Sequence, residues 1–196
     1  MPAFMTINPE EYKEYPLEVA GLKRMLPICK ISENLYIAAF IIFGDVELTK
    51  ACATELVKRM PEHDVMITAE AKGIPLIYEM ARQINAERYL IARKSPKLYM
   101  KNPYSVEVQS ITTARKQVLF LDKDDADYMR GKRVLIVDDV ISTGESAYAV
   151  EKLVTEAGGT VAGRMAILAE GDAADREDII FLQKLPLFCP EKKKEQ

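Results

Sequence analysis

Residues 134–146 combine an apolar run, two adjacent carboxylates and a loop of small polar residues. The segment reads Val-Leu-Ile-Val-Asp-Asp-Val-Ile-Ser-Thr-Gly-Glu-Ser, and its β-prone start predicts a buried strand. Asp138 and Asp139 come near the carboxyl end of that strand, where carboxylates can accept hydrogen bonds from vicinal hydroxyl groups. The loop consists of Ser142, Thr143, Gly144, Glu145 and Ser146. Because its small residues let backbone N–H groups approach a phosphate at the positive end of a helix dipole, the segment predicts a sugar-phosphate site.

Two further stretches carry groups that suit anions. The turn Glu70-Ala71-Lys72-Gly73 follows an apolar run at 64–68, and it could present backbone N–H groups and a cation to a phosphate. The cations Arg93, Lys94 and Lys97 follow the next strand-like run, at 88–92. Three cations at one strand end suit a pyrophosphate group. A solvated turn or charge run uses the same residue types, so each stretch alone leaves that alternative open.

The elements that would position these groups alternate between strand and helix. Strands are predicted at 64–68, 88–92, 133–137 and 161–168, and helices at 74–84 and between the last two strands, where Gly158-Gly159 supplies a stop. The alternation predicts an α/β fold with a mostly parallel, twisted sheet and helices on both faces. Ligands of such folds bind beyond the carboxyl ends of the strands. Before residue 60, the segment 27–43 is β-prone and the segment 46–60 is helical.

The stretch 95–113 differs from its surroundings because it is rich in Ser, Pro, Asn, Tyr and Lys. It is too polar for a core and long for a plain connection, so we interpret it as a flexible lid. The alternation at 105–111 is compatible with a β-hairpin. Candidate lid residues are Tyr104, Ser105 and Glu107.

The length of 196 residues with 48% hydrophobic residues predicts one well-buried domain. Within it we expect a small N-terminal hood at about 1–45 and a disordered charged tail at 191–196.

Composition excludes several classes of function. A net charge of −3 gives no basic field for general nucleic-acid binding. Cys29, Cys52, Cys189 and the single histidine, His63, are too widely spaced for a metal-ligand set, so we expect buried, reduced thiols. The first 15 residues lack a signal-peptide core and the longest apolar stretch, 35–43, is too short to span a bilayer. We therefore expect a cytoplasmic protein without membrane contact.

Taken in this order, the three stretches resemble the type I phosphoribosyltransferases. Residues 134–146 match the thirteen-residue family motif for phosphoribosyl pyrophosphate (PRPP), and the order of elements matches over roughly residues 64–168. The resemblance implies transfer of a phosphoribosyl group from PRPP to the nitrogen of a base, with release of pyrophosphate. It also implies Mg²⁺ bound with PRPP, no direct protein ligand to that metal, and a homodimer.

The resemblance assigns a role to each stretch. Asp138 and Asp139 would hold the ribose hydroxyls, and residues 142–146 would cradle the 5′-phosphate. The residues that would grip pyrophosphate are Ala71, Lys72, Gly73, Arg93, Lys94 and Lys97. Loss of pyrophosphate leaves positive charge on the ribose ring, so carboxylates near the sugar, cations on the leaving group and a lid that excludes water fit the chemistry.

The residues favour adenine as the base within the purine branch of the family. Lys72-Gly73, the run at 93–98 and Thr143-Gly144 agree with the adenine enzymes, whereas xanthine enzymes usually have Ser at the first place and Asn-Gly at the last. The Phe-Pro-x-Pro-Gly segment of many adenine enzymes is absent, so xanthine or another 6-oxopurine is the alternative. Phe40 and Phe43 could stack on a purine, although an apolar aromatic in a strand is more often core.

Other classes fit less well. A response-regulator receiver domain also has paired Asp after a strand, but near its start, and here 133 residues precede the motif. A PRPP-sensing regulator usually carries an added DNA-binding domain, and the residues before Pro27 are too few for one. An orotate enzyme shares the PRPP loop, but the run at 93–98 favours the purine branch.

Overall fold

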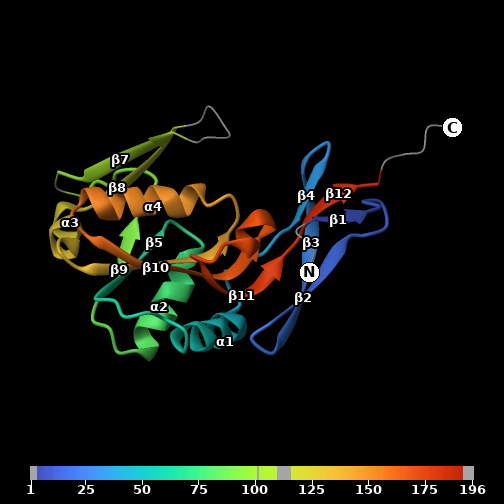
Figure 1. The fold of residues 1–196 in the computed structure, drawn as a ribbon, viewed down its shortest axis with the longest axis horizontal. Coiled ribbons are helices and arrows are strands. Elements are labelled where there is room, and N and C mark those ends of the chain that lie inside the picture. The colour runs from blue at the N-terminus through green and yellow to red at the C-terminus, as the bar shows by residue number, and fades with distance from the viewer. Residues whose placement is uncertain (1–3, 101, 110–115, 192–196) are drawn as a thin grey trace.

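The structure is a computed structural model that describes residues 4–100, 102–109 and 116–191. Its strands form a five-stranded core sheet, a five-stranded hood sheet and a two-stranded hairpin. The core sheet and its helices lie at one end of the molecule, and the hood sheet lies at the other, with both chain termini (Figure 1).

The core sheet is parallel throughout, with the strand order β11-β10-β9-β5-β6. Its strands are β5 (Val65–Ala69), β6 (Leu90–Ala92), β9 (Arg133–Ile141), β10 (Thr160–Glu170) and β11 (Ile180–Leu185). All five residues of β5 are buried, as expected for an inner strand of a sheet that is covered on both faces. The predicted mostly parallel sheet is confirmed.

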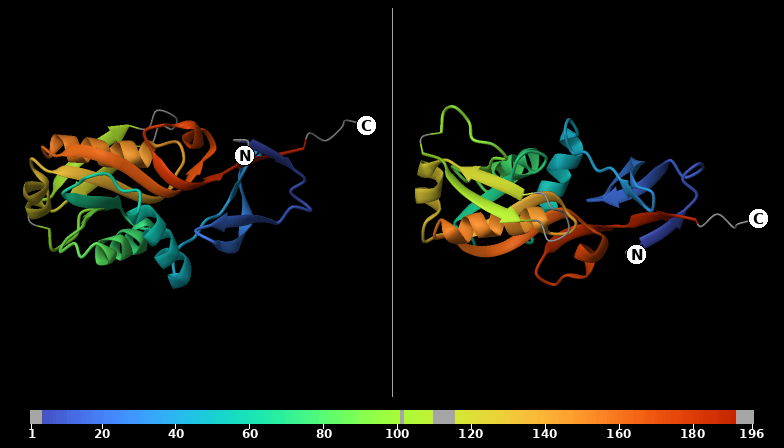
Figure 2. Two further views of the ribbon diagram at one scale, coloured as in Figure 1. Left: turned by 60° about the horizontal axis from the view of Figure 1, so that its bottom comes forward. Right: turned by 90° about the horizontal axis from the view of Figure 1, so that it is seen from above.

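Helices cover both faces of this sheet (Figures 1 and 2). They are α1 (Val46–Val57), α2 (Gly73–Gln83), α3 (Lys123–Met129), α4 (Glu145–Glu156) and the short 3-10 helix η1 (Gly171–Asp175). The helices α1 and α2 pack together on one face, and α4 lies on the other. Local sequence explains where they begin: Asp45 caps α1 by accepting the Leu48 N–H at 3.0 Å, and Pro75 is tolerated in the first turn of α2.

The hairpin predicted within the lid exists, but it extends beyond the predicted limit at residue 113. It consists of β7 (Tyr104–Gln109) and β8 (Lys116–Leu121), paired antiparallel and packed against α4. The strand β8 is held to the core because Arg93 and Phe120 exchange two backbone hydrogen bonds of 2.8 Å. Residues 101 and 110–115, which include part of the predicted strand, lie outside the described residues. The flexibility of the lid stays a prediction.

The hood sheet is built from both ends of the chain, so the N-terminal segment predicted at 1–45 is only part of it. Its strands are β1 (Phe4–Ile7), β2 (Glu14–Val19), β3 (Leu22–Ser32), β4 (Leu35–Ala38) and β12 (Leu187–Pro190). The strand β12 lies between β1 and β4, and only Pro186 separates it from β11 of the core sheet. The chain therefore passes directly from the core into the hood (Figure 2). Of the predicted tail at 191–196, only Glu191 is described, and its N–H donates to the Ile7 carbonyl at 2.9 Å.

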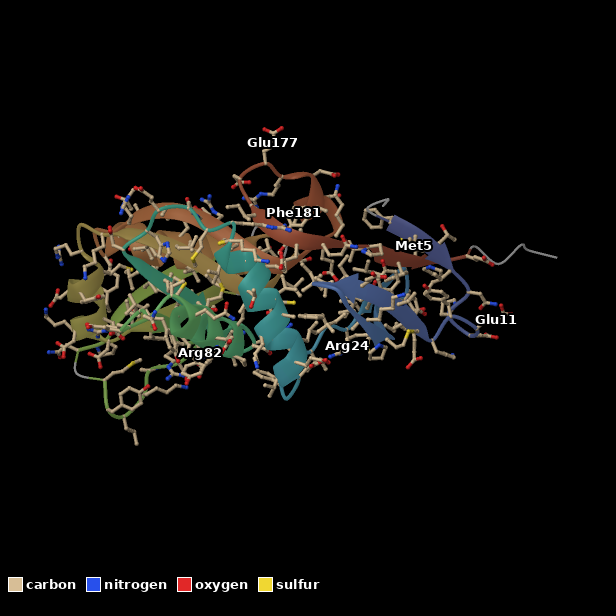
Figure 3. The ribbon with its side chains drawn as sticks, turned by 90° about the horizontal axis from the view of Figure 1, so that it is seen from below. Met5, Glu11, Arg24, Arg82, Glu177 and Phe181 are labelled. Carbon is tan, nitrogen blue, oxygen red and sulfur yellow. The ribbon has the colours of Figure 1, made fainter. Side chains whose placement is uncertain are left out.

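Two sets of contacts stabilise the hood. Phe188 of β12 is fully buried and makes an edge contact with Tyr15, with 5.4 Å between the ring centroids. Arg24 of β3 reaches the first turn of α1, where its Nε lies 2.6 Å from Asp45 Oδ2 and its Nη2 lies 2.8 Å from Glu47 Oε2. Figure 3 shows Arg24 at the junction of hood and core. The guanidinium lowers the pKa of the Asp45 carboxyl through this hydrogen bond.

The expectation of buried thiols holds for one cysteine and fails for another. Cys52 in α1 is completely buried, and that burial raises its pKa to about 12, so it is an inert core residue. Cys29 is exposed because it lies on an outward-facing position of β3. All three thiols are free. Within the described ranges, none of the helices is long and apolar enough to cross a membrane.

Replacing Phe188 with Ala should destabilise the protein strongly. The buried ring would leave a cavity between the hood strands, at a cost of about 3–5 kcal/mol in the free energy of unfolding. The matched control is Phe4→Ala in the neighbouring β1, where the side chain is 49% exposed and the expected cost is below about 1 kcal/mol. Denaturant titration would measure both, and equal costs would contradict the role of Phe188.

Candidate active site

The carboxyl ends of β5, β6, β9 and β10 bring the predicted chemical groups to one edge of the core sheet. Parallel strands end on the same side, so the groups that follow each strand meet there. Asp138 and Asp139 are the sixth and seventh of the nine residues of β9, and Asp139 is only 3% exposed. The Asp139 N–H donates to Asp138 Oδ1 at 2.9 Å, which ties the pair together.

The closeness of the two carboxyl groups makes a negative charge on Asp138 less favourable. Burial raises the pKa of Asp138 well above its usual range, and the neighbouring Asp139 charge raises it further. Lys72 acts in the opposite direction by stabilising the charged form. Perturbed carboxyl pairs of this kind cluster at functional sites.

Lys72 lies with the aspartates rather than with the other predicted pyrophosphate cations. Its Nζ is 2.7 Å from Asp139 Oδ2 and 3.5 Å from the Phe40 carbonyl oxygen of the segment that leaves the hood. The contact with Asp139 is an ion pair whose geometry is not that of a hydrogen bond, so Oδ2 has no hydrogen-bond partner among the described residues. The ammonium group thus joins the hood segment to the buried carboxylate.

The turn before α2 is packed too tightly for any residue except glycine at position 73. A Cβ on Gly73 would lie 2.1 Å from Thr68 Oγ1 and 3.2 Å from Asp138 Oδ1. The peptide between Glu70 and Ala71, earlier in the same turn, is cis. Gly73 therefore lets the end of β5, the start of α2 and the Asp138 side chain of β9 approach each other.

Glu70 contacts all three remaining predicted pyrophosphate residues, two through their cations and Lys94 through its backbone. Its carboxylate accepts the Arg93 Nη1 and the Lys94 backbone N–H, each at 3.1 Å, and lies 3.4 Å from Lys97 Nζ. The pKa of Glu70 is lowered, chiefly by the Lys94 N–H and then by Lys97. The ends of β5 and β6 thus form one electropositive cluster. Glu70 stands in the predicted turn, but sequence reasoning gave it no role of its own.

The predicted phosphate loop, residues 142–146, runs from the end of β9 into the first turn of α4. It encloses a hollow of about 90 Å³, lined by Asp138 and residues 140–147. Gly144 precedes α4 in the left-handed conformation, with φ of +80°, which favours glycine. The first N–H groups of a helix have no partner within it, so this end of α4 can offer donors to an anion.

Glu170 is a functional candidate that sequence reasoning missed. It ends β10 and is 9% exposed, and because Ala169 pairs with Ile141, it lies beside Ser142 of the phosphate loop. Burial raises the pKa of Glu170, while a hydrogen bond from Ser142 and the charge of Lys72 oppose that rise. The available signal was an acidic residue two positions after the apolar run at 161–168.

The lid candidates lie away from the carboxylates. Tyr104 and Ser105 are at the start of β7, and Tyr104 contacts Glu156 at the last turn of α4. The phosphate loop is at the other end of that helix, about 16 Å away by helical rise. The backbone carbonyl of Glu107 accepts Lys152 Nζ of α4 at 2.9 Å.

Alanine at position 73 should destabilise the fold through its contact with Thr68. The overlap should cost about 1–3 kcal/mol, which exceeds the roughly 0.5–1 kcal/mol that Ala gains over Gly in a helix. The control is a double-mutant cycle with Thr68→Ala, which removes the Oγ1 atom. The cost of Gly73→Ala should fall in that background, and an unchanged cost would show that the Thr68 contact is not its cause.

The Asp138 carboxyl should make the protein less stable as the pH rises. Its pKa is raised by folding, so above the unfolded pKa of about 3.9 the unfolded chain releases this proton first, and stability is lost up to the folded pKa. Asp138→Asn should therefore raise the unfolding temperature at pH 8 more than at pH 5.

For a surface carboxylate whose pKa is lowered, substitution by Asn should change the unfolding temperature in the opposite direction. Arg133 lowers the pKa of Asp64 to about 2, so Asp64→Asn should lower the unfolding temperature by a similar amount at pH 5 and pH 8. Thermal unfolding of both variants measures the contrast. A pH-independent effect of Asp138→Asn would refute the electrostatic account of the pair.

Comparison with known proteins identifies the family. The family model described as "Phosphoribosyl transferase domain" matches residues 48–189, well over half of the chain. The hypoxanthine/guanine phosphoribosyltransferase of Methanothrix thermoacetophila is 31% identical over 113 residues, which are 58% of this chain and 55% of that protein. The xanthine phosphoribosyltransferase of Shouchella clausii is 32% identical over 123 residues, which are 61% of this chain and 60% of that protein.

A solved structure extends the likeness to the whole fold. The adenine phosphoribosyltransferase of Thermoanaerobacter pseudethanolicus superposes with a TM-score of 0.61 at 23% identity, over 89% of this chain and 96% of that one. The aligned part of this chain spans only somewhat more than half the length of the two relatives named above. Because the motif, the family model and the fold agree, we conclude that this chain belongs to the type I phosphoribosyltransferase family.

Proposed function

We propose that this protein transfers the phosphoribosyl group of PRPP to a ring nitrogen of a purine base and releases pyrophosphate. The observation that carries the proposal is the convergence of the aspartate pair, the phosphate loop and the Glu70 cation cluster at one sheet edge. Each part matches one portion of PRPP: the ribose, the 5′-phosphate and the pyrophosphate. The names of the purine enzymes among its relatives support the same activity.

In this mechanism the bond from C1′ to pyrophosphate breaks as the bond from C1′ to the base nitrogen forms. The ribose ring carries positive charge during the exchange, so Asp138 and Asp139 stabilise it while they hold the hydroxyl groups. Residues 142–146 hold the 5′-phosphate through backbone N–H groups at the start of α4. These contacts fix C1′ between the base and the leaving group.

The leaving pyrophosphate would bind where Glu70 now holds its partners. The cations of Arg93 and Lys97 and the backbone N–H of Lys94 already converge on one carboxylate, whose two oxygens and negative charge resemble one edge of a phosphate. The backbone of Ala71 and Gly73 lies in the adjoining turn. Lys72 has a second role in this scheme, because its ion pair with Asp139 places a cation directly beside that buried carboxyl group.

Magnesium would enter with PRPP rather than bind to the free protein. Carboxylate oxygens suit Mg²⁺, but in residues 4–100, 102–109 and 116–191 no three metal-ligating side chains group together. Substrate oxygens would supply most ligands, with Asp138 and Asp139 beside the ribose hydroxyls. The ion neutralises charge on the leaving pyrophosphate when bound.

We propose adenine as the base, with AMP as the product. Lys72-Gly73, the run at 93–98 and Thr143-Gly144 support it, and they lie at the cation clusters and the phosphate loop described above. A 6-oxopurine is the second candidate because the relatives at 31% and 32% identity are named as hypoxanthine/guanine and xanthine enzymes. Adenine carries a hydrogen-bond donor, its amino group, at position 6, and a 6-oxopurine carries an acceptor there. One site therefore cannot bind both bases equally well. A homodimer remains the expectation from the family, and a cytoplasmic location remains the expectation from the sequence.

The test is release of pyrophosphate from PRPP and Mg²⁺ with adenine, hypoxanthine, guanine, xanthine or orotate in parallel. We expect release with adenine. Release with a 6-oxopurine instead would keep the chemistry and change the base, and PRPP binding without release under any base would favour a PRPP-sensing regulator.

The matched variant is the double substitution Asp138→Asn with Asp139→Asn. It should abolish turnover and leave the circular dichroism spectrum unchanged, since it removes the charge that stabilises the ribose cation but keeps the side-chain shape. Near-normal turnover in this variant would contradict the ribose assignment.

A further inference from the structure

The phosphate loop carries no cation of its own. Residues 142–146 contain one ionisable side chain, and it is the carboxylate of Glu145. The N-terminus of α4 supplies only partial positive charge, equivalent to about half an elementary charge. A 5′-phosphate carries between one and two negative charges near neutral pH. The charge balance of the loop therefore calls for a cation from another part of the chain.

Arg176 is the guanidinium that approaches this loop. It lies directly after η1, in the connection from β10 to β11, and its Nη1 is 2.6 Å from the position that a Cβ on Gly144 would occupy. No side chain separates the two, because residue 144 is glycine. Gly144 is also one of the residues that line the hollow of the loop. Arg176 is thus packed on the backbone at the N-terminus of α4.

One edge of the guanidinium is held and the other is open. Nε and Nη2 of Arg176 donate to Asp178 Oδ1 and Oδ2 at 2.9 and 2.6 Å, a bidentate arrangement. The Nη1 group, which faces Gly144, has no hydrogen-bond partner in the described part of the chain. Glu177, between the two partners, points outward at the tip of this connection (Figure 3).

A second arginine, Arg164, connects the bidentate pair of Arg176 and Asp178 to α4, the helix that follows the loop. Arg164 of β10 lies 3.3 Å from Asp178 Oδ2 through its Nη1, and its Nη2 also pairs with Glu151 of α4. Arg164 itself is only 17% exposed, whereas Arg176 and Asp178 are 39% and 47% exposed, so the buried end of this network is the one nearest to α4. Ion pairs thus link the connection after η1 to α4, and through Asp178 they reach the Arg176 guanidinium beside the loop.

We infer that Arg176 is a binding residue for the 5′-phosphate of the ribosyl substrate, supplying through Nη1 the cation that residues 142–146 lack. This inference rests on the proposed function, since it names a further residue of the same site. Asp178 and Arg164 act as positioning residues, because they orient the guanidinium and do not meet the ligand. The residue lies outside the PRPP motif, 30 positions beyond its end at Ser146.

The experiment compares binding of two probes to the full chain by calorimetry. Ribose 5-phosphate reports on the phosphate loop, and inorganic pyrophosphate reports on the Glu70 cluster. Arg176→Met should weaken ribose 5-phosphate about tenfold or more and leave pyrophosphate within about twofold. Arg176→Lys should give an intermediate loss, because it keeps the charge but cannot form the fork with Asp178. In turnover, KM for PRPP should rise while kcat stays within about threefold.

The control is Lys184→Met, which removes another cation of the same region. Lys184 pairs with Asp175 at 2.9 Å and makes no ion pair with the loop among the described residues, so neither probe should bind differently. The inference is overturned if Arg176→Met binds ribose 5-phosphate as the wild type does, or if it weakens both probes equally. If the wild type itself fails to bind ribose 5-phosphate, the proposed function fails, and this inference fails with it.

Discussion

The ion pair between Lys72 and Asp139 is the contact on which the site depends. Asp139 is almost completely buried, and a buried carboxylate is stable in its charged form only beside a cation or several donors. The cation comes from the turn between β5 and α2, and it also reaches the Phe40 carbonyl of the hood segment. One ammonium group therefore fixes the relative positions of the hood, the turn and the aspartate pair.

The groups suited to an anion and those suited to a sugar follow different strands of the same sheet. The ends of β5 and β6 carry cations, the end of β9 carries carboxylates, and β9 pairs with β5. Opposite charges on adjacent strands would neutralise each other if the side chains met freely. Glu70 pairs with Arg93 and Lys97 and accepts the backbone N–H of Lys94, whereas Lys72 pairs with Asp139. This division leaves each cluster suited to a different part of one substrate.

Sequence alone predicts the features whose causes are local. The strand at 133–137, the loop at 142–146 and the helix after it were predicted because apolar runs, small residues and Gly158 act within a few positions. The place of β12 could not be predicted, since Leu187 pairs with Phe4 and Ile37 at the other end of the chain. A short apolar strand gives no indication of which sheet it will join.

The same limit applies inside the site. Glu170 lies beside Ser142 because of the register between β10 and β9, and Arg176 lies beside Gly144 because of the course of the chain after η1. A motif records residues that are adjacent in sequence, whereas charge balance requires only that they are adjacent in space. The loop at 142–146 can keep a carboxylate at Glu145 because its counterion can come from elsewhere. An anion site that is built on backbone N–H groups thus requires small residues only in the loop itself. Its cation can come from any segment that packs beside the loop.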